Sequence, residues 1–326
     1  MALKKASLGN PAAQRRFRRQ LLAWFDRCKR DLPWRKSRDP YRVWLSEIML
    51  QQTRVAAAID HYRKFLRRFP TLEHLARARE SSLLAAWSGL GYYRRARMLH
   101  AAAKEIVKDH AGRFPETAER LRTLSGIGRY TAAAIASIAF GQPTAVVDGN
   151  VERVLQRIFG KYLSGEALWQ SAEELLDDAR PGDFNQAMME LGAVLCLPRQ
   201  PKCLQCPVNA FCATRGEHAR SAPARRQHKR EIHYALSVRN GSVFLVRRPP
   251  GAGLMPGMWE LPEIISPNGA RPWLTLRHSI TTTDYSVRVF KDVAFAENGQ
   301  WISVCRIPRL PLTGLARKIL SAAEII

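Results

Sequence analysis

Residues 123–135 read TLSGIGRYTAAAI, where two glycines one residue apart stand directly before an alanine-rich apolar run. Gly126 and Gly128 would free backbone N–H groups at the start of a helix, where a phosphate is a natural ligand. An ordinary glycine-rich turn between two helices would give the same pattern. The stretch therefore predicts a turn into a helix and leaves both interpretations open.

The net charge of the chain limits the kinds of molecule that it could bind. The formal net charge is +24, and residues 231–326 hold 11 basic and 7 acidic residues, which leaves +20 on residues 1–230. Such an excess predicts a polyanionic partner, and DNA, RNA or an anionic membrane surface would each fit the charge alone. No apolar run of about 18 residues occurs, so the sequence predicts no membrane span. The basic N-terminus lacks the apolar core of a signal peptide, and we expect a cytoplasmic location.

The chain divides by composition into three parts. Residues 1–212 have helical periodicity, and prolines at 70, 115, 143 and 181 mark boundaries between helices. Residues 213–230 carry six basic residues and no apolar period, which predicts a linker. Residues 231–326 alternate in a strand-like manner and contain an Asn240-Gly241 hairpin signal. The predicted fold is mainly α, followed by a small α/β domain.

Four of the six cysteines, Cys196, Cys203, Cys206 and Cys212, lie within 17 residues. In a cytosolic protein this clustering favours a metal site over disulfides. Only the central pair is closely spaced, which suits a [4Fe-4S] cluster, where each thiolate binds one iron, better than a structural zinc site. Zinc remains the alternative. Cys28 and Cys305 stand alone, and we expect them to be small core residues.

Together these motifs resemble a known family. LSGIGRYTAAAI, VVDGNVERVL and the cysteine loop resemble the helix-hairpin-helix DNA glycosylases that carry an iron–sulfur cluster. WLSEIMLQQTRV, WSGLGYYRRARMLH and FNQAMMELGAVLC are similar to the adenine DNA glycosylase branch. The resemblance implies two helical subdomains with a [4Fe-4S] loop and a Nudix-like C-terminal domain. It also implies a monomer that binds double-stranded DNA and excises adenine opposite 8-oxoguanine or guanine, with Gly126 and Gly128 on a DNA phosphate.

The resemblance assigns two carboxylates to the chemistry. Asp148 would stabilise positive charge on the deoxyribose as the base leaves, with Asn150 as a supporting contact, although Asp-Gly is also a common turn. Glu47 lies in an apolar stretch, where burial raises the pKa of a carboxyl, and would protonate the adenine. An exposed helix position is the alternative for Glu47.

Tyr130 stands where the related endonuclease III-like enzymes have a lysine that forms a Schiff base. A phenol cannot form an imine, so we expect a glycosylase that leaves an abasic site without cutting the strand. The alternative is a tyrosine that only packs the hairpin.

Further residues are assigned to substrate contacts by the resemblance. Base flipping is required before the carboxylates can reach the adenine. Gln52, Leu90 and Tyr92 would enter the base stack and contact the orphan base. Arg35 and Gln186 would contact the edge of the flipped adenine. Leu90 and Gln186 could equally be packing or surface residues.

The C-terminal domain departs from the family pattern. It lacks the acidic helix of catalytic Nudix enzymes after Glu263, which indicates a domain that recognises a base without hydrolysing a pyrophosphate. The family inspects 8-oxoguanine through a Phe-Ser-His run, where this chain has Ile280-Thr281-Thr282. Thr281 keeps a hydroxyl for this contact, and we expect either weaker discrimination or substitute side chains.

Particular residues disfavour four other functions. A thymine/uracil mismatch glycosylase also carries tyrosine in the hairpin, but Glu47 and the C-terminal domain argue against it. Tyr130 argues against an abasic-site lyase. A silent DNA-damage sensor predicts a missing carboxylate, and the charge of residues 1–230 fits DNA better than an electron-transfer protein.

Overall fold

The computed structural model describes residues 8–216, 228–265, 270–280, 283–291, 293, 295 and 298–326. Contacts within the chain divide it into two compact units. The first combines Met1–Tyr62 with Ala101–Ser221, and the second combines Arg63–His100 with Ala222–Ile326. Each unit is described by itself.

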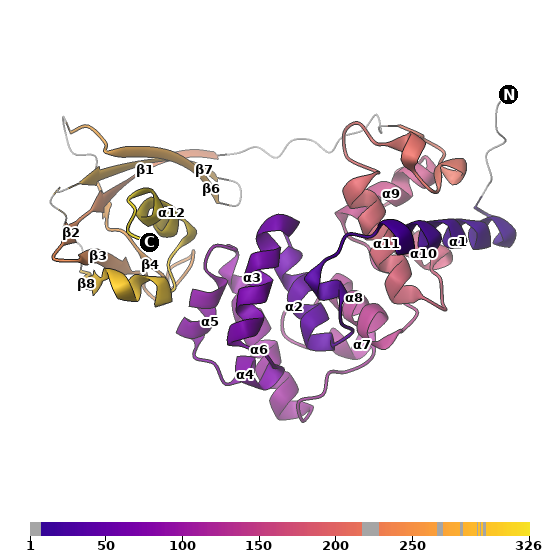
Figure 1. Cartoon of the computed structure of the whole chain (residues 1–326), viewed down its shortest axis with the longest axis horizontal. Coiled ribbons are helices and arrows are strands. Elements are labelled where there is room, and N and C mark those ends of the chain that lie inside the picture. The colour runs from indigo at the N-terminus through magenta and orange to yellow at the C-terminus, as the bar shows by residue number, and fades with distance from the viewer. Residues whose placement is uncertain are drawn as a thin grey trace. The chain divides into compact units, whose positions relative to one another are not determined.

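The first unit is helical (Figure 1). Two of its helices, α3 and α6, cross the division between the units. Its elements are α1 (Pro11–Cys28), η1 (Pro33–Arg35), α2 (Pro40–Leu50), α3 (Val55–Arg68), α6 (Tyr93–Asp109), α7 (Ala118–Leu121), α8 (Arg129–Phe140), α9 (Gly149–Phe159), α10 (Gly165–Leu175), α11 (Pro181–Val194), η2 (Cys203–Gln205) and η3 (Asn209–Phe211).

Local sequence explains where these helices begin and end. Asn10 accepts a hydrogen bond from Ala12 N at the start of α1, and a proline occupies the first turn, where a missing N–H costs nothing. Helices α8 and α9 end at Gly141 and Gly160, both in the left-handed conformation that glycine adopts without strain. Prolines 70, 115 and 143 lie between helices, as predicted, and Pro181 opens α11.

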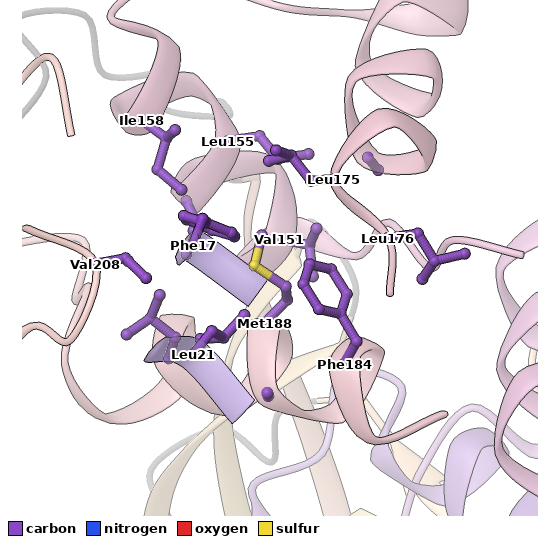
Figure 2. Packing of buried hydrophobic residues seen from close by; sticks show 14 of the residues in the cluster. Phe17, Leu21, Val151, Leu155, Ile158, Leu175, Leu176, Phe184, Met188 and Val208 are labelled. Carbon is purple, nitrogen blue, oxygen red and sulfur yellow. The ribbon is translucent and has the colours of Figure 1, made fainter. Parts of the chain in front are cut away.

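One apolar core holds α1, α9, α10 and α11 together (Figure 2). Phe17 and Leu21 of α1 are fully buried and meet Val151 and Leu155 of α9 and Phe184 of α11. Burying an aliphatic or aromatic side chain of this size contributes about 1.5–3 kcal/mol each relative to exposure. The core thereby fixes the start of α9, which carries Asp148, against α11.

Gly192 allows a close approach within that core. A Cβ at this position would lie 2.6 Å from Asn150 Cβ and 3.0 Å from the Asn150 carbonyl oxygen. Such distances are shorter than van der Waals contact, so only glycine lets α11 pack directly on the first turn of α9.

The second unit combines helices α4, α5 and α12 with two small sheets. One sheet has the order β5-β1-β7-β6, in which β1 and β7 are parallel, and the other has the order β2-β3-β4 with β8 also paired to β3. The elements are α4 (Leu72–Ala76), α5 (Glu80–Trp87), β1 (His228–Leu236), β2 (Val238–Arg239), β3 (Ser242–Arg247), β4 (Trp259–Glu260), β5 (Glu263–Ile264), β6 (Leu274–Ile280), β7 (Thr283–Lys291), β8 (Gln300–Ser303), η4 (Val304–Arg309) and α12 (Gly314–Ala322).

The apolar core of this unit is formed by strand residues that face inward and by helix α12. Val243 and Leu245 of β3, Val287 and Val289 of β7, and Ile319 of α12 are all buried within it. The spacing of two along each strand places these residues on one face.

The Asn240-Gly241 hairpin predicted from sequence joins β2 to β3. Both residues have positive φ, 47° and 66°, as a two-residue hairpin turn requires.

Residues 63–100 belong with the C-terminal part because polar contacts tie them to it. The hydroxyls of Ser88 and Tyr93 both donate to the Leu312 carbonyl oxygen at 3.0 Å. Arg317 Nε in turn donates to Ser88 Oγ at 3.0 Å, and Arg97 donates to the Pro256 carbonyl. The division therefore differs from the predicted boundary at residue 212.

The predicted fold class, mainly α with a small α/β part, is confirmed. Strand β1 begins at His228, inside the segment 213–230 that composition assigns to a linker.

The expectation for the lone cysteines was wrong, because Cys28 and Cys305 are both exposed. Cys28 continues the apolar spacing of α1, but it is the last residue of the helix, where the core has ended. Within the described residues, no helix has the length and apolar character needed to span a bilayer.

The close packing at Gly192 can be tested by adding one methyl group. We expect Gly192→Ala to lower the free energy of unfolding by about 1–3 kcal/mol, because the Cβ overlaps Asn150. Urea denaturation provides the measurement. Gly149→Ala is the matched control, since a Cβ at Gly149 meets nothing within 4 Å. Equal stability of the two variants would contradict this account of the α9–α11 contact.

Candidate active site

A cavity of about 580 Å³ lies in the first unit, and all four predicted catalytic residues line it. Its size is within the range of small-ligand sites. The predicted residues that line it are Arg35, Glu47, Gln52, Tyr130, Asp148, Asn150 and Gln186. They come from the loops and helices around α2, α8, α9 and α11, which are distant in sequence.

Glu47 of α2 is buried, with 6% of its surface exposed. Its Oε2 accepts a hydrogen bond of 2.5 Å from the Tyr130 hydroxyl, which joins α2 to α8. Burial raises the pKa of Glu47 to about 7, while the hydrogen bond from Tyr130 opposes this rise and the charge of Asp148 adds to it. An exposed helix position is therefore excluded, and the carboxyl holds its proton near neutral pH.

Tyr130 stays a neutral phenol. Burial raises its pKa well above the ordinary value, and the neighbouring charges of Glu47 and Asp148 raise it further. The hydroxyl is therefore a hydrogen-bond donor to Glu47 throughout the physiological range, and Met189 Sδ lies 3.6 Å from it.

Asp148 caps the N-terminus of α9. Its Oδ1 accepts from the backbone N–H groups of Asn150 at 2.9 Å and Val151 at 2.7 Å, and its Oδ2 accepts from the Asn150 side chain at 2.9 Å. Asp148 is thus the N-cap residue of α9, with Asn150 as its supporting contact. Three N–H donors and the helix dipole favour a fixed, anionic carboxylate at the cavity wall.

A run of hydrogen bonds extends from Asp148 to the cysteine loop. Arg153 donates to Asn150 Oδ1 at 2.9 Å, to the Gly192 carbonyl at 2.7 Å and to the Cys196 carbonyl at 2.9 Å. The guanidinium thereby fixes the Asn150 amide that in turn holds Asp148.

Glu190 of α11 also lines the cavity and was missed in the sequence. It is 1% exposed and accepts from Arg30 Nε and Nη2 at 2.7 Å each and from Arg35 Nη2 at 2.9 Å. Burial alone would raise the pKa of Glu190, but the two arginines outweigh it and lower the pKa to about 2. The available signal was a lone acidic residue in the apolar stretch AMMELGAV, the same signal that pointed to Glu47.

The glycine pair of the opening stretch forms a tight turn before α8. Gly126 has φ 73°, and Gly128 is the N-cap residue of α8 without any side-chain cap. Ile127 N–H donates to the Leu124 carbonyl at 3.2 Å. Within the described residues, the N–H groups of Gly126 and Gly128 find no backbone acceptor, so both are available to a ligand.

Other predicted residues are placed as follows. Gln52 is exposed with φ 55° and Gln186 is half-buried, and both line the cavity. Leu90 and Tyr92 belong to the second unit, where they line a separate cavity of about 820 Å³ together with His278 and Ser279. Leu90 is buried, whereas Tyr92 is 42% exposed with φ 48°. Thr281 lies outside the described residues.

The four predicted ligand cysteines lie in one compact loop after α11, all of them partly exposed. Burial raises the pKa of the Cys203 thiol, and the Cys212 and Cys196 thiols raise it further. Arg157 is buried beside them and directs Nη1 to Cys196 Sγ at 3.3 Å, while its Nε has no partner in the described chain. The described residues contain no group of three or more His, Cys, Asp or Glu side chains placed to hold a single metal ion.

Comparison with known proteins now identifies the family. The model of the HhH-GPD superfamily base excision DNA repair proteins matches residues 45–167. An adenine DNA glycosylase of rat is 41% identical over 78% of this chain and 61% of its own length. One from Schizosaccharomyces pombe is 34% identical over 76% of this chain and 69% of its own length. The chain belongs to the adenine DNA glycosylase family.

Solved structures agree with this adenine DNA glycosylase assignment at the level of the fold. A thermostable thymine-DNA glycosylase is 33% identical, with a TM-score of 0.59 over 62% of this chain and 96% of the other. A non-covalent endonuclease III–DNA complex has a TM-score of 0.54 at 22% identity, which indicates a shared fold alone. The resemblance stated from the motifs is thus confirmed. The chain spans about three fifths of the length of its rat relative.

The buried position of Glu47 predicts a pH-dependent stability. The folded pKa, about 7, exceeds the ordinary value of 4.5, so folding takes up a proton between these values. The free energy of unfolding should therefore fall as pH rises from about 4.5 to 7, by roughly 3 kcal/mol in total. Glu47→Gln should remove this dependence and make the variant more stable than the wild type at pH 8.

Urea denaturation across pH 4–9 would measure this effect. Glu119→Gln, at an exposed position on α7, is the control and should follow the wild-type curve. Parallel curves for the wild type and Glu47→Gln would mean that the carboxyl does not titrate in this range.

Proposed function

We propose that the protein excises adenine from mispairs with 8-oxoguanine or guanine in double-stranded DNA, as a base excision repair glycosylase. The observation that carries the proposal is the pairing of two carboxyl groups with opposite character on one cavity. Glu47 is buried and protonated near neutral pH, whereas Asp148 is held by three N–H donors. The names of the relatives support adenine as the target base.

Glu47 acts as the general acid. It transfers its proton to a ring nitrogen of the flipped adenine while the bond between that base and C1′ breaks, and the bonding electrons leave with the base. The resulting Glu47 carboxylate then accepts a proton from the water that attacks C1′. The products are free adenine and an abasic site. Tyr130, hydrogen-bonded to Glu47, orients the carboxyl in both states.

Asp148 stabilises the sugar. Loss of the base leaves positive charge on the deoxyribose, comparable to the oxocarbenium ion of glycoside hydrolysis. A carboxylate held at the cavity wall lowers the energy of that charge without having to reorient during the reaction. Asn150 and Arg153 keep it in place.

Recognition of the adenine edge is assigned to the polar residues opposite Glu47. Arg35 donates to Glu190 and to the Arg30 carbonyl, and a guanidinium carries five N–H donors in all. Its remaining donors suit the acceptor nitrogens of a purine ring, and Gln186 contributes a second polar contact. Arg35 is held in this orientation by its hydrogen bonds to the Glu190 carboxylate and the Arg30 carbonyl.

Two observations disfavour the alternative reactions. A thymine glycosylase has no need of a buried general acid for a purine nitrogen, although one solved structure of that activity shares the fold. A lyase requires an amine, and the neutral phenol of Tyr130 occupies the site next to Glu47. We therefore propose a monofunctional enzyme.

DNA binding is assigned to the turn at Gly126 and Gly128, whose free N–H groups suit one phosphate. Gln52, Leu90 and Tyr92 are proposed to enter the stack at the mispair. Recognition of 8-oxoguanine by the C-terminal region, with a contribution from Thr281, remains a prediction from the resemblance, as do a monomeric state and a cytoplasmic, nucleoid-associated location.

A [4Fe-4S] cluster held by Cys196, Cys203, Cys206 and Cys212 is proposed as the cofactor. Buried Arg157, directed at a sulfur, fits thiolate ligands because its charge offsets theirs. A zinc ion would require all its ligands around one centre about 2.0–2.3 Å away, whereas each thiolate of a cubane binds a different iron. The spacing of the four cysteines, of which only Cys203 and Cys206 are close in sequence, suits the cluster better than zinc. The cluster would order the loop that Arg153 and Arg157 connect to α9.

The reaction can be tested with duplexes that carry A opposite 8-oxoguanine, A opposite G, or T opposite G. We expect release of adenine from the first two, seen as strand breaks only after alkali treatment. Glu47→Gln and Asp148→Asn should each slow single-turnover release by at least 100-fold, the lower range for general acid catalysis. Glu152→Gln on α9, whose carboxylate bonds to Gln156, is the matched control.

Release of thymine alone, or strand breaks without alkali, would replace the proposed activity with one of the alternatives. Full-speed adenine release by either carboxylate variant would exclude the assigned role of that residue.

The cofactor can be tested by metal analysis of the purified protein. We expect about four irons per chain and visible absorbance near 400 nm, as for a cubane cluster. Cys203→Ser should lower the iron content, and Cys28→Ser should leave it unchanged, because Cys28 is exposed at the end of α1. One zinc per chain without iron would overturn the assignment.

A further inference from the structure

We infer that Glu105 of α6 is a positioning residue for DNA binding, because it holds the turn at Gly126–Gly128 in the shape that presents its N–H groups. This inference rests on the proposed contact between that turn and a DNA phosphate. Glu105 itself is not assigned to touch the DNA.

The contact joins two elements that are 20 residues apart. Ser125 N–H donates to Glu105 Oε2 at 2.8 Å, and the Ser125 hydroxyl donates to Glu105 Oε1. Both carboxylate oxygens are thus used by the residue that directly precedes Gly126. A carboxylate that accepts from a backbone N–H and a hydroxyl at once fixes the backbone and the side chain of that residue together.

The arrangement separates the N–H groups of the turn into two sets. Ser125 and Ile127 donate inside the protein, to Glu105 and to the Leu124 carbonyl. Gly126 and Gly128 alternate with them and, among described residues, have no backbone acceptor. Because Glu105 fixes the backbone of Ser125, it limits the conformations open to the turn that follows, and with them the directions of the Gly126 and Gly128 N–H groups.

Other contacts of the turn do not replace this one. Leu124 and Ile127 are buried and anchor the side chains, but apolar contacts do not set the orientation of an N–H group. Arg129 pairs with Glu166 and lies over the Trp169 ring, but it is the first residue of α8 and follows the turn, so this contact does not hold Ser125.

Charge and positioning make opposite predictions for Glu105. The carboxylate is negative and lies beside a proposed phosphate site, so its removal should strengthen DNA binding if charge alone mattered. If Glu105 positions the turn, its removal should weaken DNA binding, even though the net charge of the protein becomes more positive by one. The sign of the change therefore decides between the two.

The experiment measures the Kd of the full-length holoprotein for a duplex with A opposite 8-oxoguanine and for an undamaged duplex. We expect Glu105→Ala to weaken both by about tenfold, the loss of roughly one charge-assisted hydrogen bond. Glu105→Gln keeps an acceptor for Ser125 N–H and should recover much of the affinity. Ser125→Ala keeps the backbone bond and should weaken binding by only a few-fold.

Glu119→Ala is the matched control, since Glu119 is an exposed carboxylate on α7 shortly before the turn. It should bind DNA as tightly as the wild type or slightly more tightly. The single-turnover rate constant of adenine release, measured at saturating protein, should change little in Glu105→Ala, because Glu47 and Asp148 lie on other elements.

Equal or tighter DNA binding by Glu105→Ala would overturn the inference. If that variant does not fold, Glu105→Gln and Ser125→Ala decide, and wild-type affinity in both would overturn it equally. Failure of the proposed function would differ, because the wild type itself would then release no adenine.

Discussion

The hydrogen bond between Glu47 and Tyr130 is the constraint on which the site depends. It joins a carboxyl of α2 to a phenol of α8 inside an apolar environment, and it is the contact that makes burial of an acidic residue tolerable. An unpartnered carboxyl at this position would lose its hydration without compensation. Burial raises the pKa of Glu47 to about 7, and the hydrogen bond from Tyr130 lowers it without cancelling this rise.

Three carboxyl groups on one cavity illustrate how surroundings assign their roles. Burial raises the pKa of Glu47 to about 7, whereas the hydrogen bonds from Arg30 and Arg35 lower the pKa of Glu190 to about 2. Asp148 meets backbone N–H groups at a helix start, which orient it. Because the residue types are so alike, burial and partners together decide which carboxyl keeps a proton and which holds an arginine.

The packing of the first unit holds the Asp148 carboxylate in place. Gly192 brings α11 against the first turn of α9, and Arg153 then reaches Asn150, the Gly192 carbonyl and the Cys196 carbonyl at once. The start of α9 that carries Asp148, helix α11 and the cysteine loop are therefore parts of one packed region. The loop orders the helix that carries Asp148, and this gives the proposed cluster a structural role.

The sequence by itself determined the helical class, the glycine turn at 126–128 and the cysteine loop, because these depend on local spacing and chemistry. Glu47, Tyr130 and Asp148 became candidates through the resemblance of their motifs to the family. The sequence missed Glu190 and the burial state of Cys28, and it did not show that residues 63–100 group by contacts with the C-terminal part. Only the tertiary structure decided these, together with the pKa of Glu47 and the contact between Glu105 and Ser125. These features depend on contacts between side chains from elements that are distant in the chain. The periodicity of one element does not show which other element it packs against.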